Sequence, residues 1–161
     1  MSSSVSTADN RIAVGGVGPF TGRIADGYRA PDLLARLAAL PAVLASPEAR
    51  LMTTGRNRNV RVELPVHGRS VAVMVKAFGP QLWVKDLRDH HRGSKAQRTW
   101  QAASHLAARG AGTPPPIGYL ERWEGTRLRE SYYLAEYQDG AETLREALLR
   151  LFDCSPPQST Q

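Results

Sequence analysis

The sequence has very little cysteine and no long apolar run, and each absence excludes a class of protein. Its single cysteine, Cys154, excludes an intrachain disulfide and a metal cluster held by several thiolates. The longest apolar stretch, residues 33–45, is interrupted by Arg36 and Pro41, so it is too short to cross a bilayer. The first residues are polar and rich in serine, unlike a secretion signal. We therefore expect a cytoplasmic protein without a transmembrane segment.

Acidic residues are also scarce relative to basic ones. Asp and Glu number 15 against 21 Lys and Arg, which gives a net charge of +6. Most of the basic residues are arginine, which binds phosphate well, so nucleotides, nucleic acids and anionic lipid headgroups all remain possible partners. A GC-rich genome would produce the same arginine bias. The basic stretch from Lys85 to Arg98 is most simply a solvated face, and nucleic acid is the less favoured partner.

The length and local composition predict one compact domain with tails. A chain of 161 residues has room for a single core. Residues 1–23, rich in Ser, Gly and Thr, are expected to be a flexible leader. Residues 24–50 are predicted to be an N-terminal helical segment. Its helix is expected to begin at Pro31 and to end or kink at Pro41. Residues 151–161 read as a polar tail, which leaves residues 51–150 as the main folded unit.

Within residues 51–150 the hydrophobic spacing alternates between strand and helix patterns. Strands are predicted at residues 60–64 and 71–78, joined by a turn at His67 and Gly68. A helix is predicted at residues 95–109, followed by strands at 117–123 and 131–137 and a helix start at 142–151. The predicted fold class is α+β: an antiparallel sheet of about five strands with one main helix, plus an N-terminal helix.

Lys76 is the residue in this pattern that most clearly indicates chemistry. It follows Val73, Met74 and Val75 in an otherwise apolar strand, and a buried lysine without a partner is costly. In kinases a lysine on such a strand reaches the nucleotide phosphates, because phosphoryl transfer depends on positioning and charge neutralisation. The alternative is that Lys76 extends from an edge strand into solvent.

Two further segments are candidates for nucleotide contacts. Upstream of the lysine strand, Gly55, Arg56 and Asn57 lie where a phosphate-covering turn belongs, although the protein-kinase signature has three glycines there. Downstream, Glu136, Tyr137 and Gln138 resemble the hinge, whose backbone groups meet the adenine edge. An ordinary polar hairpin and a plain aromatic core strand are the alternatives. No catalytic residue is predicted, and no metal site, since the adjacent His90 and His91 seldom converge on one ion.

The combined motifs resemble the bacterial lipopolysaccharide core kinase family, which acts on Kdo or heptose sugars and has a protein-kinase-like fold. The resemblance covers about half of the chain. It is carried by Val73 to Lys76, Ser94-Lys95-Ala96 with Trp100, Arg109-Gly110 with Thr113-Pro114 and Pro116, and Tyr133 with Glu136-Tyr137. It implies ATP- and Mg²⁺-dependent phosphorylation of a sugar hydroxyl on lipopolysaccharide core, at the cytoplasmic face of the inner membrane.

The sequence departs from that family at three points. The helix glutamate that pairs the lysine is replaced by Thr99, and no acid occurs between Lys95 and Leu120. No His-Arg-Asp catalytic loop or Asp-Phe-Gly motif follows the hinge, and a polar tail stands where the large lobe should begin. We therefore expect a truncated, kinase-like small lobe with weak or vestigial ATP binding, and Mg²⁺ only if a catalytic lobe is supplied elsewhere.

Two alternatives remain open at this point. An isolated small lobe exposes the face that normally meets the large lobe, which would suit a non-catalytic interaction module or pseudokinase fragment docking on another protein or a second copy. An arginine-rich nucleic-acid binder is the weaker alternative and would show steeply salt-dependent binding.

Overall fold

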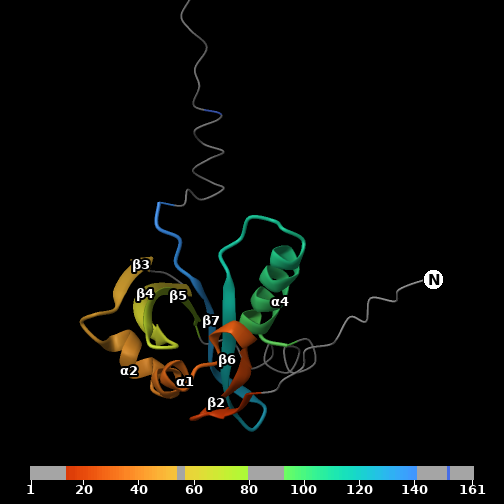
Figure 1. Ribbon diagram of the computed structural model, residues 1–161. Coiled ribbons are helices and arrows are strands. Elements are labelled where there is room, and N and C mark those ends of the chain that lie inside the picture. Colours follow the sequence, from red (N-terminus) through yellow and green to blue (C-terminus); the bar gives the residue numbers. More distant parts are fainter. Residues whose placement is uncertain (1–13, 54–56, 80–92, 141–151, 153–161) are drawn as a thin grey trace, which may run out of the picture.

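A computed structural model describes residues 14–53, 57–79, 93–140 and 152 of the chain. These residues form an α+β fold around one antiparallel sheet of seven strands, in the order β1-β2-β6-β7-β5-β4-β3 (Figure 1). The strands are β1 Val14–Val17, β2 Phe20–Ile24, β3 Arg50–Thr53, β4 Asn57–Val66, β5 Arg69–Phe78, β6 Pro116–Glu124 and β7 Arg127–Glu136.

Helices lie on both faces of the sheet. A short 3-10 turn, η1 (Asp26–Tyr28), precedes α1 (Pro31–Ala38) and α2 (Leu40–Ala45), which pack over β4. The break between α1 and α2 confirms the predicted effect of Pro41, which is one of the first residues of α2. On the other face, α4 (Lys95–Ala108) packs against β6, β7 and β5 and confirms the predicted main helix. The Ser94 hydroxyl caps α4 by accepting a hydrogen bond from the Gln97 backbone N–H.

Alternation along the strands separates a closed core from a partly open face. Val73 and Val75 of β5 are buried, whereas Met74 and Lys76 are only half-buried on the opposite face. The closed core lies under α1 and α2 and includes large, fully buried side chains: Phe20, Leu33, Leu37, Leu40, Leu64, Ile117, Leu120 and Leu134. The face under α4 is the one that remains accessible.

The central hairpin of β4 and β5 confirms the predicted turn. The two strands pair without interruption from Asn57 opposite Phe78 to Val66 opposite Arg69. The turn residues His67 and Gly68 both have positive φ, 51° and 74°. Two successive left-handed residues suit the right-handed twist of a two-residue hairpin. This turn fixes the register that places Lys76 opposite Asn59.

Asp32, in the first turn of α1, ties that helix to the hairpin turn. Its carboxylate accepts hydrogen bonds from the backbone N–H of Gly68 and of Leu33, each 2.8 Å long. The pKa of Asp32 is therefore below its ordinary value of 3.8. The hydrogen bond from Gly68 is the largest cause, and the one from Leu33 also lowers the pKa. A carboxyl group with a depressed pKa stabilises the fold when it is ionised.

We predict that Asp32→Asn lowers stability at neutral pH and has progressively less effect in acid. The stabilisation is fully present above pH 3.8 and is lost as pH falls through the lower pKa of the folded state. Urea midpoints of the two proteins, measured from neutral pH down to about pH 2, test this. Asp139→Asn, at an exposed position, is the control. A wild-type advantage that is constant across this range would contradict the prediction.

Two expectations need correction. The sheet has seven strands instead of about five, because β1 and β2 extend it beyond β6. Residues 14–23, expected to belong to a flexible leader, lie largely within those two strands. Their many glycines obscured the strand pattern in the sequence. In the structure Phe20 is buried and packs edge-on against Tyr132, with 5.8 Å between ring centroids, so this segment contributes to the core. The predicted helix at 142–151 and the polar tail lie outside the described residues, apart from Phe152.

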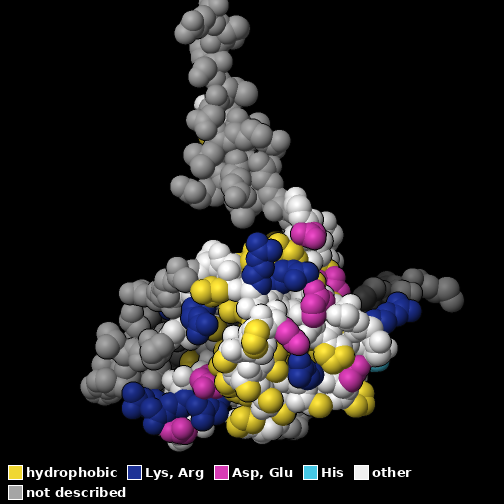
Figure 2. Space-filling model, turned by 90° about the vertical axis from the view of Figure 1, so that its left-hand side faces the viewer, with side chains coloured by type: hydrophobic (Ala, Val, Ile, Leu, Met, Phe, Trp, Pro, Cys, Tyr) yellow, Lys and Arg dark blue, Asp and Glu magenta, His cyan; other side chains and the backbone are white. Residues whose placement is uncertain are grey.

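The surface does not gather positive charge on the face that carries β3 and α2. In Figure 2 the Lys and Arg side chains of this face are interspersed with Asp and Glu. Arg61 and Glu63, 2.7 Å apart, form one of the ion pairs among the described residues. None of the described helices is both long and apolar enough to cross a membrane.

Candidate functional site

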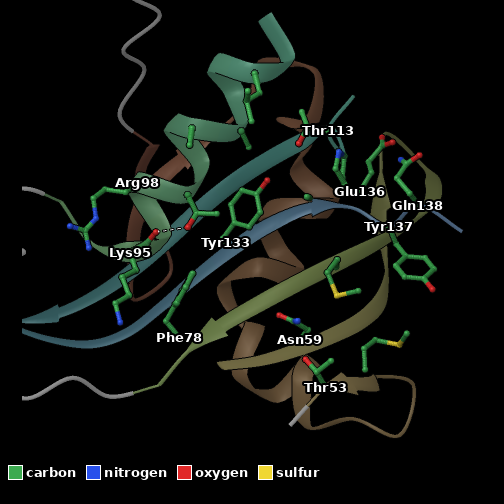
Figure 3. A pocket seen from close by; sticks show the side chains of 18 of the residues that line it. Thr53, Asn59, Phe78, Lys95, Arg98, Thr113, Tyr133, Glu136, Tyr137 and Gln138 are labelled. Atoms are coloured by element: carbon green, nitrogen blue, oxygen red, sulfur yellow. Dashed lines mark hydrogen bonds between the residues drawn. The ribbon is translucent and has the colours of Figure 1, made fainter. Parts of the chain in front are cut away.

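A large pocket lies between α4 and the open face of the sheet. Its volume is about 990 Å³. Figure 3 shows its wall, formed by α4 on one side and by β4, β5, β7 and the segments that follow α4 and β7 on the other. Its lining comprises Met52, Thr53, Asn59, Met74, Phe78, Lys95, Arg98, Thr99, Ala102, Ala103, Leu106, Thr113, Pro114, Tyr133, Ala135, Glu136, Tyr137, Gln138 and Gly140.

A row of three paired residues crosses the sheet on the side of the pocket. Asn59 of β4 pairs with Lys76 of β5, and Lys76 pairs with Tyr133 of β7. Asn59 and Tyr133 both line the pocket, and the Oδ1 atom of Asn59 is buried without a hydrogen-bond partner among the described residues. Burial raises the pKa of the Tyr133 hydroxyl, which therefore stays protonated at neutral pH and can donate a hydrogen bond.

Lys76 lies within this row but is not itself among the lining residues. Its ammonium group is 5.4 Å from the centroid of the Phe78 ring, a cation–π distance, and Phe78 does line the pocket. Within the described part of the chain, Lys76 has no carboxylate partner. Phe78 is therefore the lining residue that Lys76 is shown to contact.

Thr99 occupies the helix position at which the sequence lacks the expected glutamate. Its hydroxyl donates a 2.7 Å hydrogen bond to the backbone carbonyl of Lys95, one turn earlier in α4. The side chain is therefore bonded to its own helix, although it contributes to the pocket wall. Trp100, the next residue, packs on Tyr119 with 5.5 Å between ring centroids and fixes α4 to the sheet.

The connector after β7 has one backbone carbonyl without a donor in the sheet. The N–H of Glu136 donates to the carbonyl of Pro115 at 2.9 Å, and the N–H of Tyr137 donates to the carbonyl of Ala72 at 2.8 Å. In an antiparallel pair the Pro115 nitrogen would donate back to the Glu136 carbonyl, but proline has no N–H. The Glu136 carbonyl therefore receives no backbone hydrogen bond from Pro115, and Glu136 is one of the residues that line the pocket.

The carboxylate of Glu136 is bonded to a residue far away in the sequence. The hydroxyl of Tyr28, in η1, donates to Glu136 Oε1 at 2.6 Å. Burial and this hydrogen bond raise the pKa of Tyr28 well above its ordinary value. Tyr28 therefore holds one oxygen of this carboxylate in place. Sequence spacing offered no signal for a contact between residues 108 positions apart.

The structure brings together some of the predicted site residues and leaves others aside. Glu136, Tyr137 and Gln138, the three residues of the predicted hinge, line the pocket. Asn57 starts β4 opposite Phe78 and does not line it, whereas Asn59 does. Gly55 and Arg56 lie outside the described residues. Phe78, Lys95 and Arg98 were not predicted as site residues, although strand alternation from Lys76 would have indicated Phe78.

The two ends of the pocket differ in charge. In Figure 3, Lys95 and Arg98 lie on one side of the view, and Thr113, Glu136, Tyr137 and Gln138 lie on the other. Glu136 is the only acidic residue in the described lining.

No group of three or more His, Cys, Asp or Glu side chains among the described residues is arranged to hold a metal ion. Comparisons with protein-family models, curated proteins and solved structures found no match.

Proposed function

We propose that the pocket between α4 and the sheet binds a nucleotide, in the manner of the small lobe of the lipopolysaccharide core kinases that the sequence resembles. One observation carries the proposal: three elements that the resemblance associates with a nucleotide border the same cavity. They are the lysine strand β5, helix α4 and the connector after β7. Their order along the chain is also the order that the kinase-like pattern requires.

The chemistry of the pocket suits a purine base at the Glu136 end. The carbonyl of Glu136, to which Pro115 cannot donate, would accept a hydrogen bond from the exocyclic amino group of a purine. Beside it the lining is apolar, with Met74, Tyr133 and Ala135. A cavity of about 990 Å³, largely apolar with a few placed polar groups, has the character of a small-molecule site.

Mg²⁺ fits this part of the chain less well than a nucleotide does. Mg²⁺ is usually held by one or two carboxylates together with the substrate phosphates. The only carboxylate in the described lining, that of Glu136, is bonded to Tyr28. Phosphoryl transfer also needs a catalytic aspartate, and the described lining of the pocket contains no aspartate. The proposal for this chain is therefore nucleotide binding, and sugar phosphorylation is proposed only where a catalytic lobe is supplied.

Calorimetric titration of the 161-residue chain with ATP tests this function. We expect saturable binding that weakens at least about tenfold in Ala102→Trp, because the exposed Ala102 lines the pocket and a bulky side chain there would fill it. Ala107→Trp, at an exposed position of α4 outside the lining, is the matched control and should bind as the wild type does.

Lys76→Ala tests the lysine within the same experiment. We expect weaker ATP binding, because its ammonium group lies beside the pocket-lining Phe78. ATP affinity that is unchanged in both Lys76→Ala and Ala102→Trp would show that the nucleotide binds elsewhere. Absence of any binding would remove the proposed function.

A further inference from the structure

We infer that Tyr28 is a positioning residue for the pocket between α4 and the sheet. Its hydroxyl holds the side chain of Glu136 at the end of β7 and thereby fixes the connector that borders the base end of the pocket. This inference rests on the proposed nucleotide binding and goes beyond it, since it makes the N-terminal segment part of what shapes the site. Tyr28 is not among the described lining residues, so it acts through Glu136.

The side chain of Glu136 leaves β7 on the face opposite the pocket. Leu134 and Glu136 are two residues apart in the strand, so their side chains lie on the same face of the sheet. Leu134 is buried in the core under α1 and α2, whereas Tyr133 and Ala135 line the pocket. On the closed face the Oε1 atom of Glu136 accepts the 2.6 Å hydrogen bond from Tyr28. The end of the strand is therefore anchored from behind the pocket.

The backbone holds this end of β7 at two points, and one expected bond cannot form. The N–H of Glu136 donates to the carbonyl of Pro115, and the N–H of Tyr137 donates to the carbonyl of Ala72. Pro115 has no N–H with which to return a bond to Glu136. The bond from Tyr28 therefore adds a third point of attachment where the backbone ladder is incomplete. A hydrogen bond to a carboxylate is stronger than one between neutral groups, so this attachment is firm.

Tyr28 is itself held in place, as a positioning residue must be. Its carbonyl accepts a 2.8 Å hydrogen bond from the N–H of Ala30, and its ring packs against the core. The carbonyl oxygen of the adjacent Gly27 lies 3.3 Å from Nε2 of His67, in the turn between β4 and β5. The η1 segment thus connects that turn with the connector at Glu136. Burial raises the pKa of the Tyr28 hydroxyl, which is therefore a proton donor at neutral pH.

Titration of the full chain with ATP and with adenosine tests this role. In Tyr28→Phe we expect both ligands to bind about three- to tenfold more weakly and by the same factor, because the connector borders the base. Glu136→Ala should reproduce the loss, and Tyr28→Phe should add nothing in that background. Tyr119→Phe is the matched control. It removes a tyrosine hydroxyl from the sheet outside the lining and should leave the affinity for both ligands as in the wild type.

Three other results would overturn the inference. Unchanged affinity in Tyr28→Phe would reduce the bond to a contribution to stability, which a lower urea midpoint would register. A loss for ATP but not for adenosine would show that the hydroxyl screens the charge of Glu136 from the phosphates. A further, equal loss in the Glu136→Ala background would show that Tyr28 does not act through Glu136. If the wild-type chain binds neither ligand, the proposed function itself fails.

Discussion

Replacing Gly22 with alanine is expected to lower the free energy of unfolding by about 3 kcal/mol or more. Gly22 lies in β2 opposite Leu120 of β6, with φ at 155°. A Cβ atom at this position would overlap the backbone carbonyl of Tyr119. A backbone atom in a paired strand cannot move aside as a flexible side chain can, so β2 would have to separate from β6.

The effect should be large because the same approach is close from the other strand. Gly118 of β6 faces Ile24 of β2, and a Cβ atom on Gly118 would overlap the carbonyl of Arg23. Separating the strands would also expose Phe20 and Ile24, which are buried in the core.

Urea unfolding of wild type, Gly22→Ala and Gly112→Ala measures this difference. Gly112 has open space around it and φ outside the positive range, so its alanine variant should be within about 0.5 kcal/mol of wild type. If Gly22→Ala is as stable as Gly112→Ala, β2 is not held against β6 in solution.

These glycines also explain which parts of the fold the sequence could predict. The hairpin of β4 and β5 and helix α4 were predictable because their side chains follow periods of two and 3.6 residues, and because His67-Gly68 is a strong turn signal. β1 and β2 contain glycines that indicate a loop when only neighbours in sequence are considered. The role of Gly22 in β2 depends on close approach to β6, a contact between residues nearly a hundred positions apart in the chain.

The candidate site was predictable only where one strand or connector determines it. Lys76 and the segment 136–138 could be located because each follows from the position of a strand. The bond from Tyr28 to Glu136 and the contribution of Lys95 and Arg98 arise from packing of separate elements. In the sequence, those two cations look like ordinary solvated residues of a basic stretch. Only the position of α4 over the sheet makes them part of the wall of a cavity.

Replacing Leu134 with alanine should be the other severe change, with a loss of about 2–5 kcal/mol. Leu134 is fully buried in the core under α1 and α2, between Tyr133 and Ala135, which line the pocket on the opposite face of β7. Removing its side chain leaves a cavity beneath the strand that forms the pocket floor. Because the lining itself is unchanged, ATP affinity should be largely retained under conditions in which the variant is folded.

Leu106→Ala is the matched variant, with the same change of side chain on the accessible face. Leu106 lines the pocket but is 47% exposed, so its loss should cost less than about 1 kcal/mol and should instead weaken ligand binding. Urea unfolding and ATP titration of both variants therefore give opposite patterns if the sheet has a closed face for stability and an open face for binding. If Leu106→Ala destabilises the chain as much as Leu134→Ala, then the face under α4 is covered in solution, and a ligand would have to compete with whatever covers it.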